Sequence, residues 1–127
     1  MCSSNAPEAA APTCSNDDDE TDATVGWASG WIIFQDLDPF LAGGSRDDLD
    51  PILRVQPALR VLGGIQASSD ATNRLRFTGT GRLLLTDAAN ELTFVFGGAN
   101  YVANVQRTVC VNAGGRGKIA GDGDAQC

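Results

Sequence analysis

The 127-residue chain contains no histidine and only one lysine, Lys118. Without histidine the usual general base of Ser-His-Asp and Cys-His catalysis is missing, and no serine is flanked as in a nucleophile elbow. Glu8, Glu20 and Glu91 are scattered, so a catalytic carboxylate pair is not indicated. A Schiff-base role for Lys118 lacks the apolar surroundings that such chemistry needs. We therefore predict that the protein is not an enzyme.

Long apolar runs are also missing, since no stretch is long enough to cross a bilayer. The start Met1-Cys2 has neither the positive charge nor the apolar core of a signal peptide, and we interpret Met1 as an expression start. At this length we expect one domain, residues 1–127, which buries roughly two-thirds of its unfolded surface. Within it, residues 1–24 form a polar, acidic surface loop and residues 25–127 a β body.

The four cysteines include no C-x-x-C pair, which argues against the usual zinc spacings. We expect no metal and no cofactor, and instead two disulfides, which indicate an oxidising compartment such as the periplasm or cell exterior. Three pairings are possible in principle. The sequence-local choice joins Cys2 to Cys14 and Cys110 to Cys127, and each loop would stabilise the fold by roughly 3 kcal/mol.

Short segments with period-two alternation or dense β-branched and aromatic residues follow one another along the chain, and no window has helical periodicity. We therefore predict a mainly β protein of seven to eight short strands arranged as two packed antiparallel sheets. The expected strands cover residues 31–34, 52–56, 59–67 with a break at Gly63-Gly64, 74–78, 82–86, 92–96, 105–111 and 116–119.

The C-terminal segment is predicted to be a hairpin. Val105, Arg107, Val109 and Val111 share one face of the first strand, and Gln106, Thr108 and Cys110 share the other. The glycines of 113–115 allow the chain to reverse. On the returning strand Arg116 and Lys118 lie on one face, about 7 Å apart by strand rise.

Three short segments together resemble the FimT/FimU/GspH-type minor pilins and pseudopilins. Residues 110–118 are similar to the family's C-terminal signature, Gly-Arg-x-Arg after a strand, with Lys118 in place of the second arginine. Residues 30–36 (GWIIFQD) and 53–55 (LRV) are similar to two further family motifs. The resemblance implies a type IV pilin-like head domain from which the N-terminal hydrophobic helix has been removed. It also favours the pairs Cys2–Cys14 and Cys110–Cys127.

The resemblance implies a minor type IV pilin that takes part in pilus assembly and binds double-stranded DNA without sequence preference during natural transformation. It carries this role to Gly115, Arg116 and Lys118. Its expected partners are DNA, other minor pilins and the major pilin, with membrane contact only through the removed helix. The expected location is the inner membrane and periplasm, then the pilus on the surface of a Gram-negative bacterium. The alternative is a GspH-like pseudopilin of type II secretion with a purely assembly role.

Charge distribution permits DNA binding despite the net charge of −7. Residues 1–50 carry eleven acidic residues and one arginine (−10), and residues 51–127 carry five acidic residues and eight cations (+3), which sum to −7. A basic face can therefore bind phosphates if the acidic half points away. Besides Arg116 and Lys118, we expect the binding residues to include Arg107 of the preceding strand and the hairpin arginines Arg74, Arg76 and Arg82.

Two acidic segments raise the question of a cation site. The run Asp17–Glu20 has consecutive carboxylates that alternate in direction, so we interpret it as a solvated loop. Members of the family often have a calcium-loop-like pattern near residues 36–50, but Pro39, Phe40 and Leu41 stand in place of its central ligands. Five aspartates remain there, and we predict no metal site: Asp36, Asp38, Asp47, Asp48 and Asp50.

Overall fold

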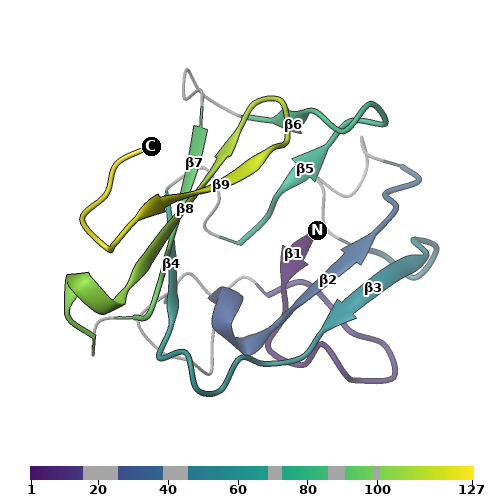
Figure 1. Cartoon of the computed structure of the whole chain (residues 1–127). Helices are drawn as coiled ribbons and strands as arrows, with labels where there is room; N and C mark the ends of the chain where they lie inside the picture. The colour runs from purple at the N-terminus through teal and green to yellow at the C-terminus, as the bar shows by residue number, and fades with distance from the viewer. Residues whose placement is uncertain (16–25, 39–45, 69–72, 86–90, 99–100) are drawn as a thin grey trace.

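The computed structural model describes residues 1–15, 26–38, 46–68, 73–85, 91–98 and 101–127. The elements within these residues are nine strands and two short 3-10 helices, η1 (Gly26–Ser29) and η3 (Ala103–Val105) (Figure 1). The prediction of a mainly β protein is confirmed. The strands are β1 (Cys2–Ser3), β2 (Trp31–Phe34), β3 (Ile52–Gln56), β4 (Ile65–Ala67), β5 (Arg76–Phe77), β6 (Leu83–Leu84), β7 (Glu91–Phe96), β8 (Arg107–Asn112) and β9 (Gly117–Gly121).

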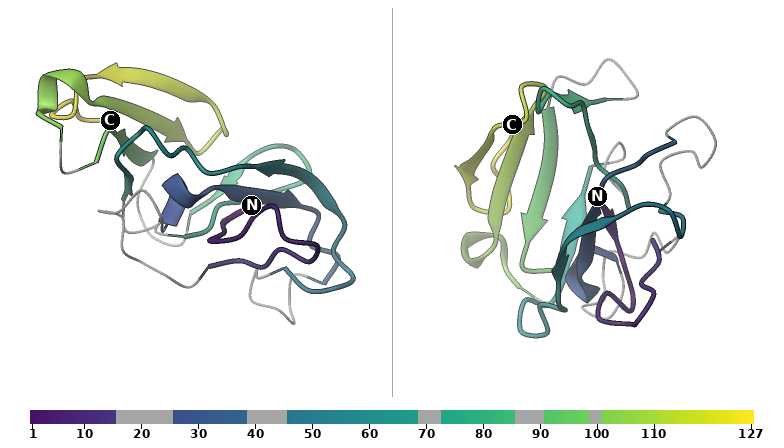
Figure 2. Two further views of the ribbon diagram at one scale, coloured as in Figure 1. Left: turned by 90° about the horizontal axis from the view of Figure 1, so that it is seen from below. Right: turned by 90° about the vertical axis from the view of Figure 1, so that its right-hand side faces the viewer.

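The described strands form three antiparallel sheets, with the orders β1-β2-β3, β4-β7-β8-β9 and β5-β6. The sequence predicts two antiparallel sheets without assigning strands to them, and the structure has three. The third is the short hairpin β5-β6, whose two strands pair with each other and not with a strand of the other two sheets. Figure 2 shows the sheet that ends in β8 and β9 lying to one side of the sheet formed by β1, β2 and β3.

Trp27 of η1 is the centre of the main hydrophobic core and is 2% exposed. Its ring meets those of Trp31 and Phe94 edge to face, at centroid distances of 6.4 and 5.8 Å. Such edge-on pairs add to the free energy gained by burying aromatic area. The other buried members come from η1, β4, the residue before β5, β6 and β7: Ala28, Ile65, Leu75, Leu83 and Leu92. A second, smaller core of Cys2, Ile32 and Phe34 lies in the β1-β2-β3 sheet.

Several expected boundaries differ from the structure: the strand expected at 74–78 shortens to β5, and β9 begins one residue after Arg116. Three further differences have a clear cause. Cys2–Ser3 is a strand and not part of a loop, because Cys2 is buried and pairs with Ile32. Residues 59–62 turn instead of forming a strand, since Leu62 N–H donates to the Leu59 carbonyl, and the chain then passes Gly63 with φ +77°. Val105 ends η3, and β8 begins only at Arg107.

Two disulfides join Cys2 to Cys14 and Cys110 to Cys127, the sequence-local pairing. The first fixes the amino-terminal segment to β1, and the second ties the C-terminal residues to the middle of β8. The run Asp17–Glu20 lies outside the described residues. No helix among the described residues is long and apolar enough to cross a membrane.

The aspartates of residues 46–50 stabilise their own turn. Asp50 is 2% exposed, and its two carboxylate oxygens accept hydrogen bonds from Leu37 N at 2.9 Å and Asp47 N at 3.1 Å. Asp47 Oδ1 in turn accepts from Leu49 N at 2.8 Å. The backbone therefore satisfies these carboxylates, which is a structural role for them. Residues 39–45 of the same segment lie outside the described part.

Candidate nucleic-acid interface

The turn between β8 and β9 positions Arg116. Gly115 has φ +75°, which a glycine adopts without the steric cost of a side chain. Asn112 closes the turn on both sides: its carbonyl accepts from Gly115 N at 2.8 Å, and its side-chain Oδ1 accepts from Arg116 N at 3.1 Å. Arg116 thus lies in the turn directly before β9 and not in the strand itself. Its side chain is exposed.

The β5-β6 turn positions Arg82 in a similar way. Thr78 accepts from Gly81 N through its carbonyl at 2.9 Å and from Arg82 N through Oγ1 at 3.1 Å. The Thr78 hydroxyl also lies 2.9 Å from that of Thr80. These bonds fix the backbone at Arg82, whose side chain is exposed.

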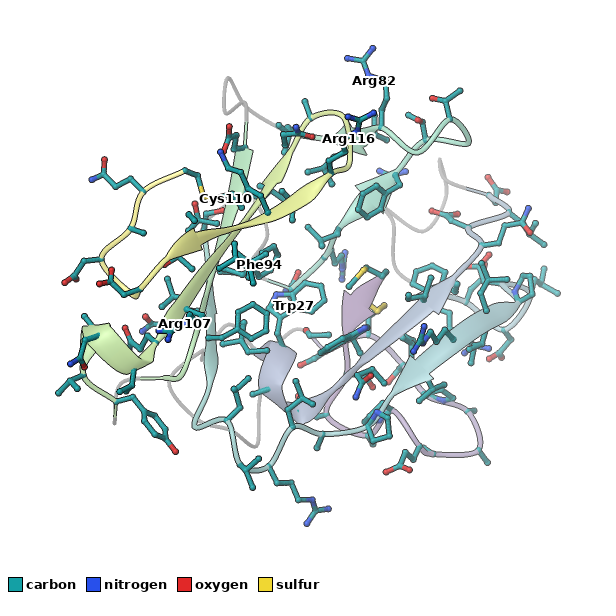
Figure 3. The ribbon with its side chains drawn as sticks, in the orientation of Figure 1. Trp27, Arg82, Phe94, Arg107, Cys110 and Arg116 are labelled. Atoms are coloured by element: carbon teal, nitrogen blue, oxygen red, sulfur yellow. A yellow bond between two sulfur atoms is a disulfide. The ribbon has the colours of Figure 1, made fainter. Side chains whose placement is uncertain are left out.

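The two turns are in contact. A Cβ at Gly115 would overlap the Gly81 carbonyl oxygen, so the backbones approach as only glycine allows. A hydrogen bond from Leu83 N to the Ala113 carbonyl, 3.0 Å long, fixes the two hairpins to each other. Figure 3 shows Arg82 and Arg116 at the same end of the molecule. We call this end, formed by residues 78–82 and 112–116, the double-turn end.

Lys118 follows on β9, where it pairs with Cys110. Its Nζ lies 3.7 Å from Glu91 Oε2, and the lysine side chain is 61% exposed. Glu91 begins β7 and pairs with Asn112, so the ion pair spans β8 diagonally. Lys118 therefore lies beside the double-turn end, with part of its charge offset by a carboxylate.

The other three expected binding residues lie elsewhere. Arg107 begins β8, five residues before Asn112, so strand rise separates it from the double-turn end by roughly 17 Å. Its guanidinium donates to the carbonyls of Asn104 and Gln106 at 3.2 and 2.6 Å. Figure 3 places Arg107 at the opposite end of the hairpin from Arg116.

Arg74 and Arg76 belong to the side of the β1-β2-β3 sheet. Arg74 forms a bridge pair with Cys2 of β1. Arg76 makes an ion pair with Asp36 at 3.9 Å, and that carboxylate follows β2. The structure thus brings together Arg82, Arg116 and Lys118 and places Arg107 at the other end of β8. Arg74 lies beside Cys2, and Arg76, two residues before Thr78, is paired with the carboxylate of Asp36.

Sequence reasoning missed Glu91, which faces Lys118, and it gave no reason to prefer Arg82 over the other hairpin arginines. The pairing of Glu91 with Asn112 depends on the β7-β8 register, and no local signal fixes that register across twenty-one residues. The contact between Gly81 and Gly115 is long-range in the same sense. The glycines in the two predicted turns are the one sequence signal that bears on this contact.

The double-turn end suits anions and not metals. No ion pair among the described residues involves Arg82 or Arg116, so both guanidinium groups can contact phosphates. Glu91, Cys110 and Cys127 form the one group of potential metal ligands among the described residues. The sulfur atoms of Cys110 and Cys127 are joined in a disulfide, so they cannot act as thiolate ligands.

In a comparison with known families, residues 2–115 match the family model described as type II transport protein GspH. The matched region covers the β1-β2-β3 sheet, the core and the β8 strand through Gly115. No curated protein and no solved structure matches the chain.

Proposed function

The chain belongs to the GspH family of type II transport proteins, and from this premise we propose that its double-turn end binds the phosphate backbone of double-stranded DNA without sequence preference. Family membership gives the chain a pseudopilin or minor pilin role, in type II secretion or in pilus assembly. Members of this family are membrane-anchored periplasmic pseudopilins. The proposal specifies a DNA-uptake function of the FimT type, exercised on a pilus during natural transformation.

The observation that carries this proposal is the contact between the Gly81 and Gly115 turns, which gathers two exposed arginines from different hairpins. Two guanidinium groups on neighbouring turns, with Lys118 beside them, form a compact cationic end. Phosphate contacts of this kind give affinity and no sequence information. The three cations belong to exposed turns and an exposed strand, and exposed cations of this kind suit a duplex better than a small ligand, which is bound in a pocket.

The test is DNA affinity measured by fluorescence anisotropy on a labelled random duplex. Replacing Arg82 and Arg116 together by Gln should weaken binding by at least tenfold, since each lost phosphate contact removes a charge-assisted hydrogen bond. The matched control replaces Arg54 and Arg60, which are exposed on β3 and in the 59–62 turn, and leaves the same net charge. Equal losses of DNA affinity in the two variants would mean that net charge alone determines binding, and would refute the proposed site.

A second candidate function is subunit contact alone, and one observation favours it. Tyr101, Val102 and Val105 are 46%, 69% and 56% exposed around η3, at the far end of β8 from the double-turn end. Exposed apolar groups of this size are typical of surfaces that contact partners. We propose that this η3 group contacts other minor pilins or the major pilin.

The two functions separate by mutation. Val102→Asp with Val105→Asp should abolish incorporation into pili and leave DNA affinity unchanged, because the two regions lie at opposite ends of β8. Pilus incorporation is measured by immunoblotting of sheared surface fractions. Loss of DNA affinity in this variant, with the fold intact, would contradict the division of roles.

A further inference from the structure

Strand β1 has neighbours on both of its edges. Cys2 pairs with Ile32 of β2 on one side and with Arg74 on the other. On the second side Met1 and Leu75 exchange two hydrogen bonds, of 2.7 Å from the Met1 amino group and 2.9 Å from Leu75 N. The segment that leads into β5 therefore pairs with β1, which lies between β2 and the β5 side as a central strand.

Both flanking strands continue past Met1. On β2 the antiparallel register places Phe34 opposite the residue that would precede Met1. On the β5 side the Met1–Leu75 pair places Phe77 opposite the residue before that one. Among the described residues, no strand pairs with these two positions on the side of β1.

The backbone groups of Phe34 and Phe77 face the space between the two strands. The carbonyl of Gly30, directly before β2, accepts from Ser4 N. Gln35 N, directly after β2, donates to Pro51 on the opposite side, so alternation directs Phe34 toward β1. Thr78 N donates to the Arg82 carbonyl, toward β6, so alternation directs Phe77 away from β6. The backbone donors and acceptors of Phe34 and Phe77 thus face each other across the two positions that would precede Met1.

A cleft of about 600 Å³ lies at this position. Its lining combines Met1, the end of β2 at Phe34–Asp36 and the β5 side from Leu75 to Gly79. Figure 1 shows the amino terminus between β5 and the end of β2, at the entrance to this region. Phe77, 43% exposed, presents an apolar ring there.

We propose that polypeptide joined to the amino group of Met1 fills this cleft as an extended strand that continues β1 and pairs with Phe34 and Phe77. The strand would unite β1-β2-β3 and β5-β6 into one sheet of order β3-β2-β1-β5-β6. A helix that ended directly at Met1 would not present its backbone to both neighbours. Any helix in such a segment therefore ends at least two residues before Met1.

The Met1 amino group supports this occupant. It donates to the Leu75 carbonyl at 2.7 Å, and a peptide N–H at the same place would make the same bond. Burial lowers the pKa of this amino group to about 6, because the charged form loses its hydration. A neutral peptide group in its place removes that cost.

The test uses the chain extended before Met1 by Thr-Val-Thr-Val, with amide hydrogen exchange followed by NMR. We expect the Phe34 and Phe77 amides to exchange at least tenfold more slowly than in the unextended chain. Gln35 and Thr78 are internal controls, since their amides already donate to Pro51 and Arg82 and should not change. The matched control extension, Thr-Val-Pro-Pro, should give no slowing, because proline is excluded from central strands.

Three outcomes would overturn the proposal. One is equal exchange at Phe34 and Phe77 in all three forms, which means that the extension does not enter the cleft. In another outcome the extension has no effect, but a free hexapeptide, Thr-Val-Thr-Val-Thr-Val, slows amide exchange at Phe34 and Phe77 of the unextended chain. The cleft would then bind a separate polypeptide. The third is a slowing of amide exchange that depends on protein concentration, which would mean that a second copy of the protein fills the cleft.

Discussion

Glu91 Oε2 lies 3.7 Å from Lys118 Nζ, two strands apart in the same sheet. This pair places a carboxylate next to one of the three cations of the proposed DNA interface. Because both side chains are partly exposed, the pair contributes little to stability. Its effect on a bound polyanion is larger, since the carboxylate repels phosphates and competes for the lysine.

Glu91→Gln should therefore raise DNA affinity by about twofold to fivefold at moderate salt. The measurement is fluorescence anisotropy with a random duplex. Asp36→Asn removes the partner of Arg76, which is not one of the three cations of the proposed interface, and should leave affinity nearly unchanged. An Asp36 effect as large as the Glu91 effect would mean that net charge alone determines binding.

Salt dependence reports the number of phosphates that the interface neutralises. Three cations predict a slope of log affinity against log salt of roughly −2.7, at about −0.9 for each contact. Arg116→Gln should make the slope less steep by about 0.9, the value for one phosphate contact. Arg107→Gln should leave the slope unchanged. Binding indifferent to salt would exclude phosphate contact as the mechanism.

Gly115→Ala should destabilise the fold by about 1–3 kcal/mol, because it combines an unfavourable positive φ with overlap on the Gly81 carbonyl. It should also weaken DNA binding, since separating the turns moves Arg116 away from Arg82. Gly79→Ala is the control: nothing lies within 4 Å of a Cβ there, and the variant should be close to neutral. Urea denaturation and anisotropy measure the two effects.

Removing the Cys110–Cys127 disulfide by a double Ser replacement should lower stability by about 3 kcal/mol, as expected for a loop with a sequence separation of 17 residues. Chemical denaturation under non-reducing conditions gives the value. The same replacement at Cys2 and Cys14, with a separation of 12, should cost a similar amount. Unchanged stability in either variant would contradict the stabilising effect predicted for that disulfide.

Stability should rise between pH 6 and 8. The Met1 amino group has a pKa of about 6 in the folded chain against 8.0 unfolded, so the unfolded state binds more protons in this window. The chain has no histidine, which leaves few other groups to titrate there. Thermal midpoints across the window test this, and acetylation of the amino terminus should flatten the profile. A slope that survives acetylation would refute the assignment.

Local patterns were sufficient for the elements that the sequence predicted well. Residues 52–56 form a strand with the expected bounds, because Pro51 and Pro57 limit it on both sides. Trp31–Phe34 forms the expected buried strand from a dense β-branched and aromatic run. The two disulfides joined the nearest cysteines in sequence.

Long-range register explains what the sequence did not predict. β1 is only two residues long, so it shows no period, and its pairing with Ile32 and Arg74 exists only in the folded chain. The same holds for the choice among the arginines. Arg74, Arg76 and Arg82 look alike on an alternating hairpin, and only the turn-to-turn contact separates Arg82 from the other two.

The backbone contact between Gly81 and Gly115 means that the sequences of the two turns constrain each other. A side chain gained at Gly115 would require the opposite loop to retreat, so changes in one loop are tolerated only with matching changes in the other. Loss of the glycine at 115 should therefore be accompanied by a change in the loop around Gly81, and the spacing between the two guanidinium groups should change with it.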